Sequence, residues 1–191
     1  VCDVSGSMFD TIETGQTKLE SAKEAAKMVV DTTETWSKSN EESNSIGVVQ
    51  FSDDAISLCQ PHIDYKYIKE CISNMEDGGG TNIYTGIDAG IEQLKAVSSE
   101  NKVMILMTDG QDSADQLTRE SAEVAAKNNI KIYTIGFGAD VNETLLTEIA
   151  ESTGGEYRFA DTNNMMGIIG SFMYAQQASN ASVLTEIEDT V

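Results

Sequence analysis

The chain has 191 residues, of which 40% are hydrophobic and 23% charged, a balance typical of one globular domain with a buried core. Its 12 lysine and arginine residues stand against 32 aspartate and glutamate residues, which gives a formal charge of −20. A field of that sign repels phosphate backbones and anionic lipid headgroups, so nucleic acid is not an expected partner. Membrane insertion is not expected either, because no apolar run approaches the roughly 20 residues that cross a bilayer.

The start of the chain carries the first chemical signal. Residues 3–8 read Asp-Val-Ser-Gly-Ser-Met, so Asp3, Ser5 and Ser7 form a D-x-S-x-S motif directly after an apolar start. A capping box formed by Thr17 and Glu20 then predicts a helix start. Apolar side chains follow at helical spacing through residue 36, which predicts an amphipathic helix that covers a sheet.

Strand and helix signals alternate along the rest of the chain, which is typical of an α/β fold with helices on both faces of a sheet. Residues 55–58 follow the preceding strand too closely for a crossover helix, so we expect an antiparallel edge strand there. Apolar runs predict interior parallel strands at residues 46–51, 103–107 and 130–137, and residues 156–159 are expected at the opposite edge. Further helical patterns cover residues 83–97, 117–128, 142–152 and 163–178.

Two later segments add oxygen side chains to those of the D-x-S-x-S motif. Residues 78–81 read Gly-Gly-Gly-Thr and residues 107–110 read Met-Thr-Asp-Gly, which contribute Thr81 and Asp109. Two carboxylates and three hydroxyls suit a hard divalent cation, namely Mg²⁺ with Mn²⁺ or Ca²⁺ as substitutes. The alternative is that the hydroxyl residues cap helices while the two aspartates end strands.

This three-part pattern resembles the metal-ion-dependent adhesion site (MIDAS) of von Willebrand factor type A (vWA) domains, which is D-x-S-x-S, then a threonine, then an aspartate. All five positions match, at Asp3, Ser5, Ser7, Thr81 and Asp109. The resemblance covers residues 1–178. It implies a Rossmann-like, doubly wound, mostly parallel six-stranded sheet of order 3-2-1-4-5-6 with strand 3 antiparallel. Ligands of open α/β sheets bind at the carboxyl ends of strands where the strand order reverses, and this order places Asp3 and Asp109 there.

The resemblance also implies a function: a non-enzymatic, Mg²⁺-dependent protein-binding module for adhesion or interaction. A partner's Asp or Glu carboxylate would complete the metal shell. Ser5, Ser7 and Thr81 are expected as direct ligands, and Asp3 and Asp109 as ligands directly or through water. The alternative is a metal-assisted hydrolase, or a chelatase-type subunit associated with an AAA ATPase, that uses the same cation.

Catalytic residues are not expected. The single histidine, His62, follows Pro61 in an expected loop, so a Ser-His-Asp triad has little support. The glycine-rich segment lacks the lysine of a phosphate-binding loop. The D-x-S motif also lacks the second aspartate that D-x-D phosphotransferases need.

The remaining expectations concern the cysteines and the ends of the chain. Pairing of Cys59 with Cys71 is left open, with free thiols favoured because the total of 3 cysteines is odd. Residues 179–191 are expected to form a tail or the start of a following domain. With a short first strand, this predicts a fragment of a larger extracellular or cell-surface protein, whose oligomeric state the sequence leaves open.

Overall fold

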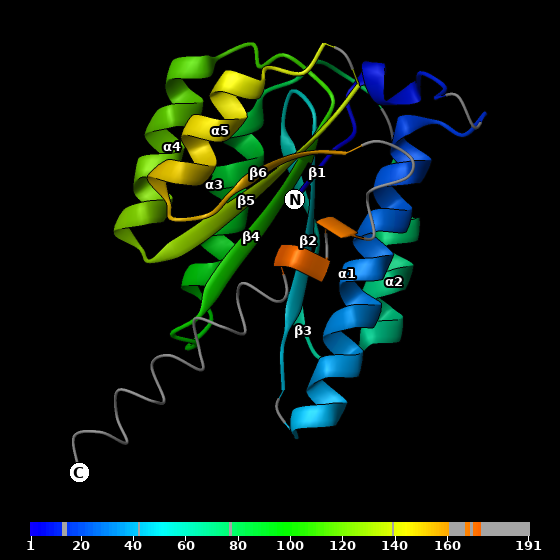
Figure 1. The fold of residues 1–191 in the computed structure, drawn as a ribbon, viewed down its shortest axis with the longest axis vertical. Coiled ribbons are helices and arrows are strands. Elements are labelled where there is room, and N and C mark those ends of the chain that lie inside the picture. The colour runs from blue at the N-terminus through cyan, green and yellow to red at the C-terminus, as the bar shows by residue number, and fades with distance from the viewer. Residues whose placement is uncertain are drawn as a thin grey trace.

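The computed structural model describes residues 1–12, 15–41, 43–76, 78–138, 140–160, 167–168 and 170–172. A six-stranded sheet of order β3-β2-β1-β4-β5-β6 forms the centre of the fold (Figure 1). Its strands are β1 (Cys2–Asp3), β2 (Ile46–Phe51), β3 (Ala55–His62), β4 (Lys102–Thr108), β5 (Ile130–Phe137) and β6 (Tyr157–Ala160). Neighbouring strands are parallel except β2 and β3. The predicted strand order, with its antiparallel third strand, is therefore confirmed.

Helices cover both faces of this sheet. They are α1 (Lys18–Asn40), α2 (Tyr65–Ser73), α3 (Ile83–Lys95), α4 (Asp115–Lys127) and α5 (Glu143–Ser152), with a short 3-10 helix η1 (Gly6–Phe9) after β1. Figure 1 shows α1 and α2 on one side of the sheet and α3, α4 and α5 on the other. In β5, Ile130 and Ile132 join the core under α3 to α5, whereas Tyr133 and Ile135 join the core under α1 and α2. Burial on both faces explains why interior strands are almost continuously apolar.

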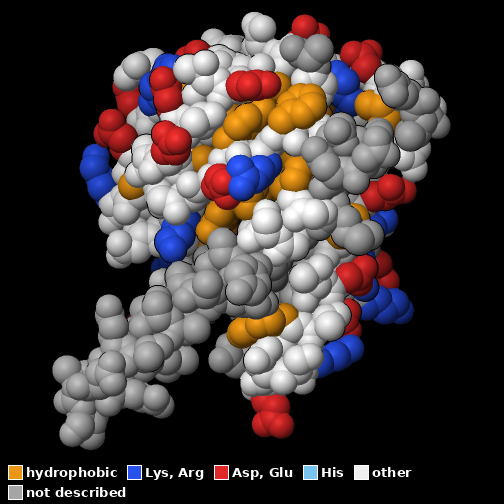
Figure 2. Space-filling model, in the orientation of Figure 1, with side chains coloured by type: hydrophobic (Ala, Val, Ile, Leu, Met, Phe, Trp, Pro, Cys, Tyr) orange, Lys and Arg blue, Asp and Glu red, His pale blue; other side chains and the backbone are white. Residues whose placement is uncertain are grey.

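The surface differs between the helices and the sheet edge. Figure 2 shows charged side chains over α4 and α5, and a band of apolar side chains along the sheet edge near β6. Within the described residues, no helix combines the length and the apolar character that crossing a membrane requires.

The amphipathic helix α1 begins as predicted. Thr17 accepts a hydrogen bond from the Glu20 backbone while Glu20 accepts one from the Thr17 backbone, which completes the capping box. The helix after Thr81 also matches its prediction, since the apolar stripe from Ile83 to Ile91 is buried. Most of the helix expected at residues 163–178 and all of the tail at 179–191 lie outside the described residues. Of that helix, Phe172 is described and packs against Tyr133.

One expectation about residues 55–73 was wrong, and one helix there was missed. Strand β3 extends to His62, so Pro61 and His62 lie in a strand rather than in a loop. Proline is tolerated there because β3 is an edge strand of the described sheet and its pairing with β2 is irregular near Pro61. Helix α2 was not predicted, although Asp64 caps it by accepting hydrogen bonds from the backbone of Lys66 and Tyr67.

The three cysteines are buried free thiols, in line with the favoured expectation. Burial and the neighbouring Cys71 raise the pKa of Cys59 to about 12. Its thiol is therefore protonated at neutral pH.

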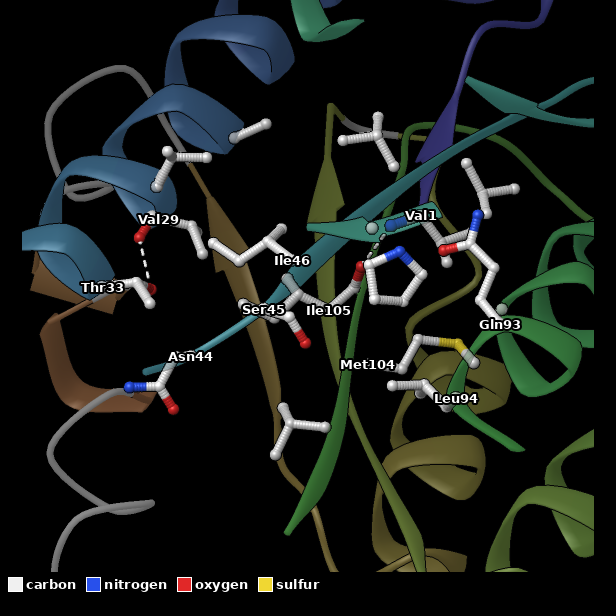
Figure 3. Close-up of a pocket in the computed structure, with 18 of the residues that line it drawn as sticks. Val1, Val29, Thr33, Asn44, Ser45, Ile46, Gln93, Leu94, Met104 and Ile105 are labelled. Carbon is white, nitrogen blue, oxygen red and sulfur yellow. Dashed lines mark hydrogen bonds between the residues drawn. The ribbon is translucent and has the colours of Figure 1, made fainter. Parts of the chain in front are cut away.

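A cavity of about 480 Å³ lies beside the start of β1, between the first halves of β2 and β4 (Figure 3). In β1, only Cys2 and Asp3 pair with β2, so residues 46–49 of β2 have no neighbour on that side in the described sheet. The amino-terminal ammonium group of Val1 donates a hydrogen bond of 2.9 Å to the Ile105 carbonyl at the edge of this cavity. The cavity therefore lies in line with β1, ahead of Cys2 and between β2 and β4.

Candidate metal centre

The predicted oxygen ligands meet at the carboxyl ends of β1 and β4. In Figure 1 these strands run toward the top of the picture. The Ser7 hydroxyl donates a hydrogen bond of 2.9 Å to Asp109 Oδ1, across 102 residues of sequence. Ser5 Oγ and Ser7 Oγ are 3.2 Å apart. Asp3 Oδ1 accepts a 2.8 Å hydrogen bond from the Ser5 backbone, which holds the loop after β1 over the strand end.

Thr81 reaches the same place from the loop before α3. A Cβ atom added to Gly110 would lie 3.1 Å from Thr81 Oγ1, so the Thr81 hydroxyl lies against the backbone that follows Asp109. The Thr81 carbonyl accepts a 3.0 Å hydrogen bond from the Ser113 backbone. The structure therefore brings all five predicted residues together where the loops after β1 and β4 and the loop before α3 meet, and this place is called the crevice.

The glycines before Thr81 connect its loop to the D-x-S-x-S loop. Gly78 N donates to the Val4 carbonyl at 2.7 Å, and Gly6 N donates to the Gly79 carbonyl at 3.0 Å. Gly79 has a φ of +86°, and a Cβ atom there would lie 2.7 Å from the Asp53 carboxylate. Glycine is therefore required for backbone conformation and for close approach, and not merely for flexibility.

Asp3 is fully buried, and its environment disfavours the charged form. Asp3 Oδ2 accepts a 2.5 Å hydrogen bond from the Thr108 hydroxyl. Burial raises the pKa of the Asp3 carboxyl, and the nearby Asp109 adds to the rise, although the hydrogen bonds from Thr108 and Ser5 oppose it. A cation beside Asp3 would offset this unfavourable burial of charge.

The residues in the crevice fit a hard divalent cation. Adjacent ligands of an octahedral Mg²⁺ at 2.0–2.1 Å are separated by about 3.0 Å, and hydrogen-bonded oxygens have similar separations. The oxygens of Ser7 and Asp109 are 2.9 Å apart and those of Ser5 and Ser7 are 3.2 Å apart. These distances suit hydrogen bonds and also neighbouring ligands of one Mg²⁺ ion. The Thr81 hydroxyl makes no side-chain hydrogen bond to any described residue, so it is available as a ligand. In the described part of the chain, no three His, Cys, Asp or Glu residues gather as a metal group, so any such site depends on the hydroxyls.

Sequence reasoning missed three residues that shape the crevice. Lys18 Nζ lies 2.5 Å from Asp109 Oδ2. Thr108 donates to Asp3, as described above. Asp112 accepts a 3.0 Å hydrogen bond from the Ile83 backbone and another from the Thr118 hydroxyl, which ties the loop after β4 to the start of α3. The sequence signals were the position of Lys18 directly after the capping Thr17 and of Asp112 shortly after Asp109.

The histidine lies away from this crevice. His62 pairs with Ile46, the first residue of β2, whereas the crevice lies beyond the last residues of the parallel strands. The cavity of Figure 3 is likewise at the amino ends of β2 and β4, and none of the five oxygen ligands lines it. Cavity and crevice are therefore separate features.

Residues 1–170 match the family model of the von Willebrand factor type A domain, and the chain belongs to this family. It is 26% identical over 167 residues to human inter-alpha-trypsin inhibitor heavy chain H3, a match that covers 78% of this chain and 17% of that protein. It is 33% identical over 120 residues to the collagen alpha-1(XXI) chain of Xenopus laevis, covering 60% of this chain and 12% of that protein. The chain thus spans a small part of these relatives' lengths.

Solved structures share the fold at low sequence identity. A von Willebrand factor type A structure from Catenulispora acidiphila has a TM-score of 0.74 and 22% identity, covering 92% of this chain and 40% of that one. Proximal thread matrix protein 1 from the mussel byssus, solved with a zinc-occupied MIDAS motif, has a TM-score of 0.70 and 20% identity. That match covers 88% of this chain and 43% of that one. At such identities these likenesses establish the fold alone.

Proposed function

We propose that this chain is a non-enzymatic protein-binding domain whose crevice holds Mg²⁺, or Mn²⁺ in its place, and binds a carboxylate of a partner protein. Asp3, Ser5, Ser7, Thr81 and Asp109 would hold the cation. The observation that carries the proposal is the 2.9 Å contact of Ser7 with Asp109 across 102 residues, because it joins separate parts of the motif in one crevice. The zinc-occupied MIDAS of the mussel protein supports the proposal by analogy of fold.

Each ligand type has a distinct role in this proposal. Asp3 and Asp109 supply the negative charge that attracts the cation, while the three hydroxyls add neutral oxygens. When bound, the cation would supply a positive centre that accepts an anionic oxygen. Ser7 is exposed whereas Asp3 and Asp109 are buried, so a partner would approach from the side of Ser7.

The alternative of a metal-assisted hydrolase or chelatase-type subunit has no specific observation in its favour. Such chemistry calls for a general base within hydrogen-bond reach of the substrate. His62 lies at the other end of the sheet, and the hydrogen bonds of the described crevice engage both carboxylates. We therefore propose interaction rather than catalysis.

The relatives support a location outside the cell. They include a collagen alpha-1(XXI) chain and an inter-alpha-trypsin inhibitor heavy chain. We propose that the domain belongs to an extracellular or cell-surface protein.

The proposed site is tested by removing one neutral ligand. Thr81→Val keeps the shape of the side chain but removes the hydroxyl, so we expect Mn²⁺ and Mg²⁺ to bind at least about tenfold more weakly, equivalent to about 1.4 kcal/mol. Isothermal titration calorimetry on chelator-treated protein measures this affinity. Thr35→Val, on the exposed side of α1, is the matched control and should bind like wild type. Equal affinities of wild type and Thr81→Val would place the cation elsewhere.

Salt dependence tests the charge of the partner. The domain's charge of −20 repels an acidic partner at long range, before any contact with the crevice forms. Because the Debye length falls from about 30 Å at 0.01 M salt to about 8 Å at 0.15 M, the on-rate of an acidic partner should rise with salt at fixed Mg²⁺. Surface plasmon resonance at the two salt concentrations measures it, and a falling on-rate would indicate that a local positive patch controls the encounter.

A further inference from the structure

Lys18 is the one lysine or arginine that the described structure places against a predicted cation ligand. It is the first residue of α1, and its Nζ lies 2.5 Å from Asp109 Oδ2 and 3.8 Å from Asp10 Oδ2. The Lys18 side chain is 15% exposed and that of Asp109 is 0% exposed. This ion pair is thus withdrawn from water, unlike the exposed pairs along the outer helices.

The position of Lys18 is not explained by the stability of its helix. A positive charge in the first turn opposes the helix dipole, which favours anions at that end. The backbone nevertheless fixes Lys18, since its N–H donates a 3.0 Å hydrogen bond to the Asp10 carbonyl. A Cβ atom on Gly138 would lie 3.4 Å from Lys18 Cε and Nζ, so the side chain passes over the end of β5 to reach Asp109 beyond β4. The fold therefore directs this ammonium group into the crevice.

Lys18 changes the charge balance of the crevice. The two carboxylates among the predicted ligands, Asp3 and Asp109, are buried, and together with the Lys18 ammonium group they carry a formal charge of minus one. A divalent cation would bring that charge to plus one with Lys18 present, and to zero without it. Charges this close and this little exposed to water are weakly screened.

We propose that Lys18 determines the specificity of the crevice: its ammonium group competes with a divalent cation for Asp109 and leaves the loaded crevice positively charged, which favours an anionic oxygen. This inference rests on the proposed function, because it assumes that the cation binds beside Asp109. It assigns two opposite effects to one residue. Lys18 lowers the affinity for the cation and raises the affinity of the loaded crevice for a carboxylate.

The test compares Lys18→Met with a control of equal charge change. Lys127→Met also removes one positive charge, but it lies in the last turn of α4, at the end of the helix that leads into the start of β5 and away from the crevice. Chelator-treated wild type and both variants are titrated with MnCl₂ by calorimetry at constant ionic strength, in sodium chloride and in sodium acetate. Circular dichroism checks the fold, and Lys18→Gln provides a second variant.

We expect Lys18→Met to bind Mn²⁺ at least about tenfold more tightly than wild type, whereas Lys127→Met stays within about twofold. Acetate should strengthen Mn²⁺ binding by wild type more than by Lys18→Met. A purely structural role, in which Lys18 only holds Asp109 in place, predicts the reverse: weaker binding by Lys18→Met and recovery in Lys18→Arg. Weaker Mn²⁺ binding by Lys18→Met, or equal affinities of wild type and Lys18→Met, would overturn the proposed role of Lys18. Neither result would argue against the proposed metal site.

The same titration separates this inference from the proposed function. If Thr81→Val and wild type bound Mn²⁺ equally, the cation would not lie in the crevice and both proposals would fail. If Thr81→Val bound more weakly but Lys18→Met did not bind more tightly, only the role of Lys18 would fail.

Discussion

Extending the chain ahead of Val1 by four valine and isoleucine residues is expected to raise its melting temperature by about 5–10 °C. The added residues would continue β1 into the cavity of about 480 Å³ between residues 46–49 of β2 and the first half of β4. Both flanking strands would then gain backbone hydrogen bonds along edges that have no neighbour in the described sheet. The extension would also remove the ammonium charge that now lies beside the Ile105 carbonyl.

The size of this effect follows from opposing terms. Burying each apolar side chain contributes about 1.5–3 kcal/mol, while ordering each residue costs about 1–2 kcal/mol of backbone entropy. Backbone hydrogen bonds add about 0.5–1.5 kcal/mol each, and the side-chain entropy that each residue loses, about 0.5–1 kcal/mol, offsets most of that addition, so we expect a net gain of about 2–4 kcal/mol. For a domain of this size, 1 kcal/mol corresponds to about 2–4 °C in melting temperature.

Differential scanning calorimetry of the extended and unextended chains measures the gain. An extension of four alternating glycine and serine residues is the matched control, because it removes the same ammonium charge without apolar burial. We expect little change from that control. If both extensions raised the melting temperature equally, removal of the charge rather than completion of the sheet would be the cause.

Asp3→Asn is expected to stabilise the protein without metal and to weaken its binding of Mg²⁺ by more than about a hundredfold. Asparagine keeps an oxygen that can accept the hydrogen bond from the Ser5 backbone, but it carries no charge into a fully buried place. In EDTA we expect the melting temperature to rise by about 2–4 °C, or about 1 kcal/mol. The loss of affinity follows because the variant removes one of the two carboxylates among the five oxygen ligands.

The pH dependence of this gain has a definite sign. Burial raises the pKa of the Asp3 carboxyl above its ordinary value of 3.8, so the folded protein holds this proton more tightly than the unfolded chain does. The charge of Asp3 does not affect the free energy of unfolding below pH 3.8. Above that pH it lowers the free energy of unfolding, and the effect is complete once the pH exceeds the raised pKa of the folded state. The advantage of Asp3→Asn over wild type should therefore be larger at pH 7 than at pH 4.

Asp88→Asn is the matched control for this experiment. Asp88 is exposed on α3, and its variant changes the net charge by the same amount. Urea denaturation in EDTA at both pH values, followed by circular dichroism, gives the free energies of unfolding. A variant Asp3→Asn that was less stable than wild type at pH 7 would show that the hydrogen bond from Thr108 outweighs the cost of burying the charge.

The sequence predicted those helices and strands whose own residue types indicate the structure, without contacts from elsewhere in the chain. The capping box at Thr17 and Glu20 depends on contacts within one helical turn, so it could be identified without the rest of the molecule. Strand β5 could be identified because burial on both faces makes it almost continuously apolar. Helix α2 was missed because it has only 9 residues, and the charged Lys69 and Glu70 interrupt its apolar pattern between the buried Ile68 and Ile72.

Strand β3 illustrates how tertiary position overrides local preference. Proline disfavours a strand because it has no N–H to donate, so the sequence around Pro61 favoured a loop. In the fold that strand is at the edge of the described sheet, and its pairing with β2 is irregular between Ile46 and Val48, where the proline lies. The strand therefore continues to His62.

The sequence by itself determined the class of fold and the set of candidate oxygen ligands, because alternation of elements and the chemistry of side chains are written in the order of residues. Tertiary structure alone decided that Ser7 contacts Asp109 and that Lys18 shares the same carboxylate. A lysine at the start of a helix has the pattern of an ordinary surface charge. Lys18 becomes part of the crevice only because β1, β4 and β5 are neighbours in the sheet. Their carboxyl ends therefore lie side by side, and residues far apart in sequence come within reach of one another there.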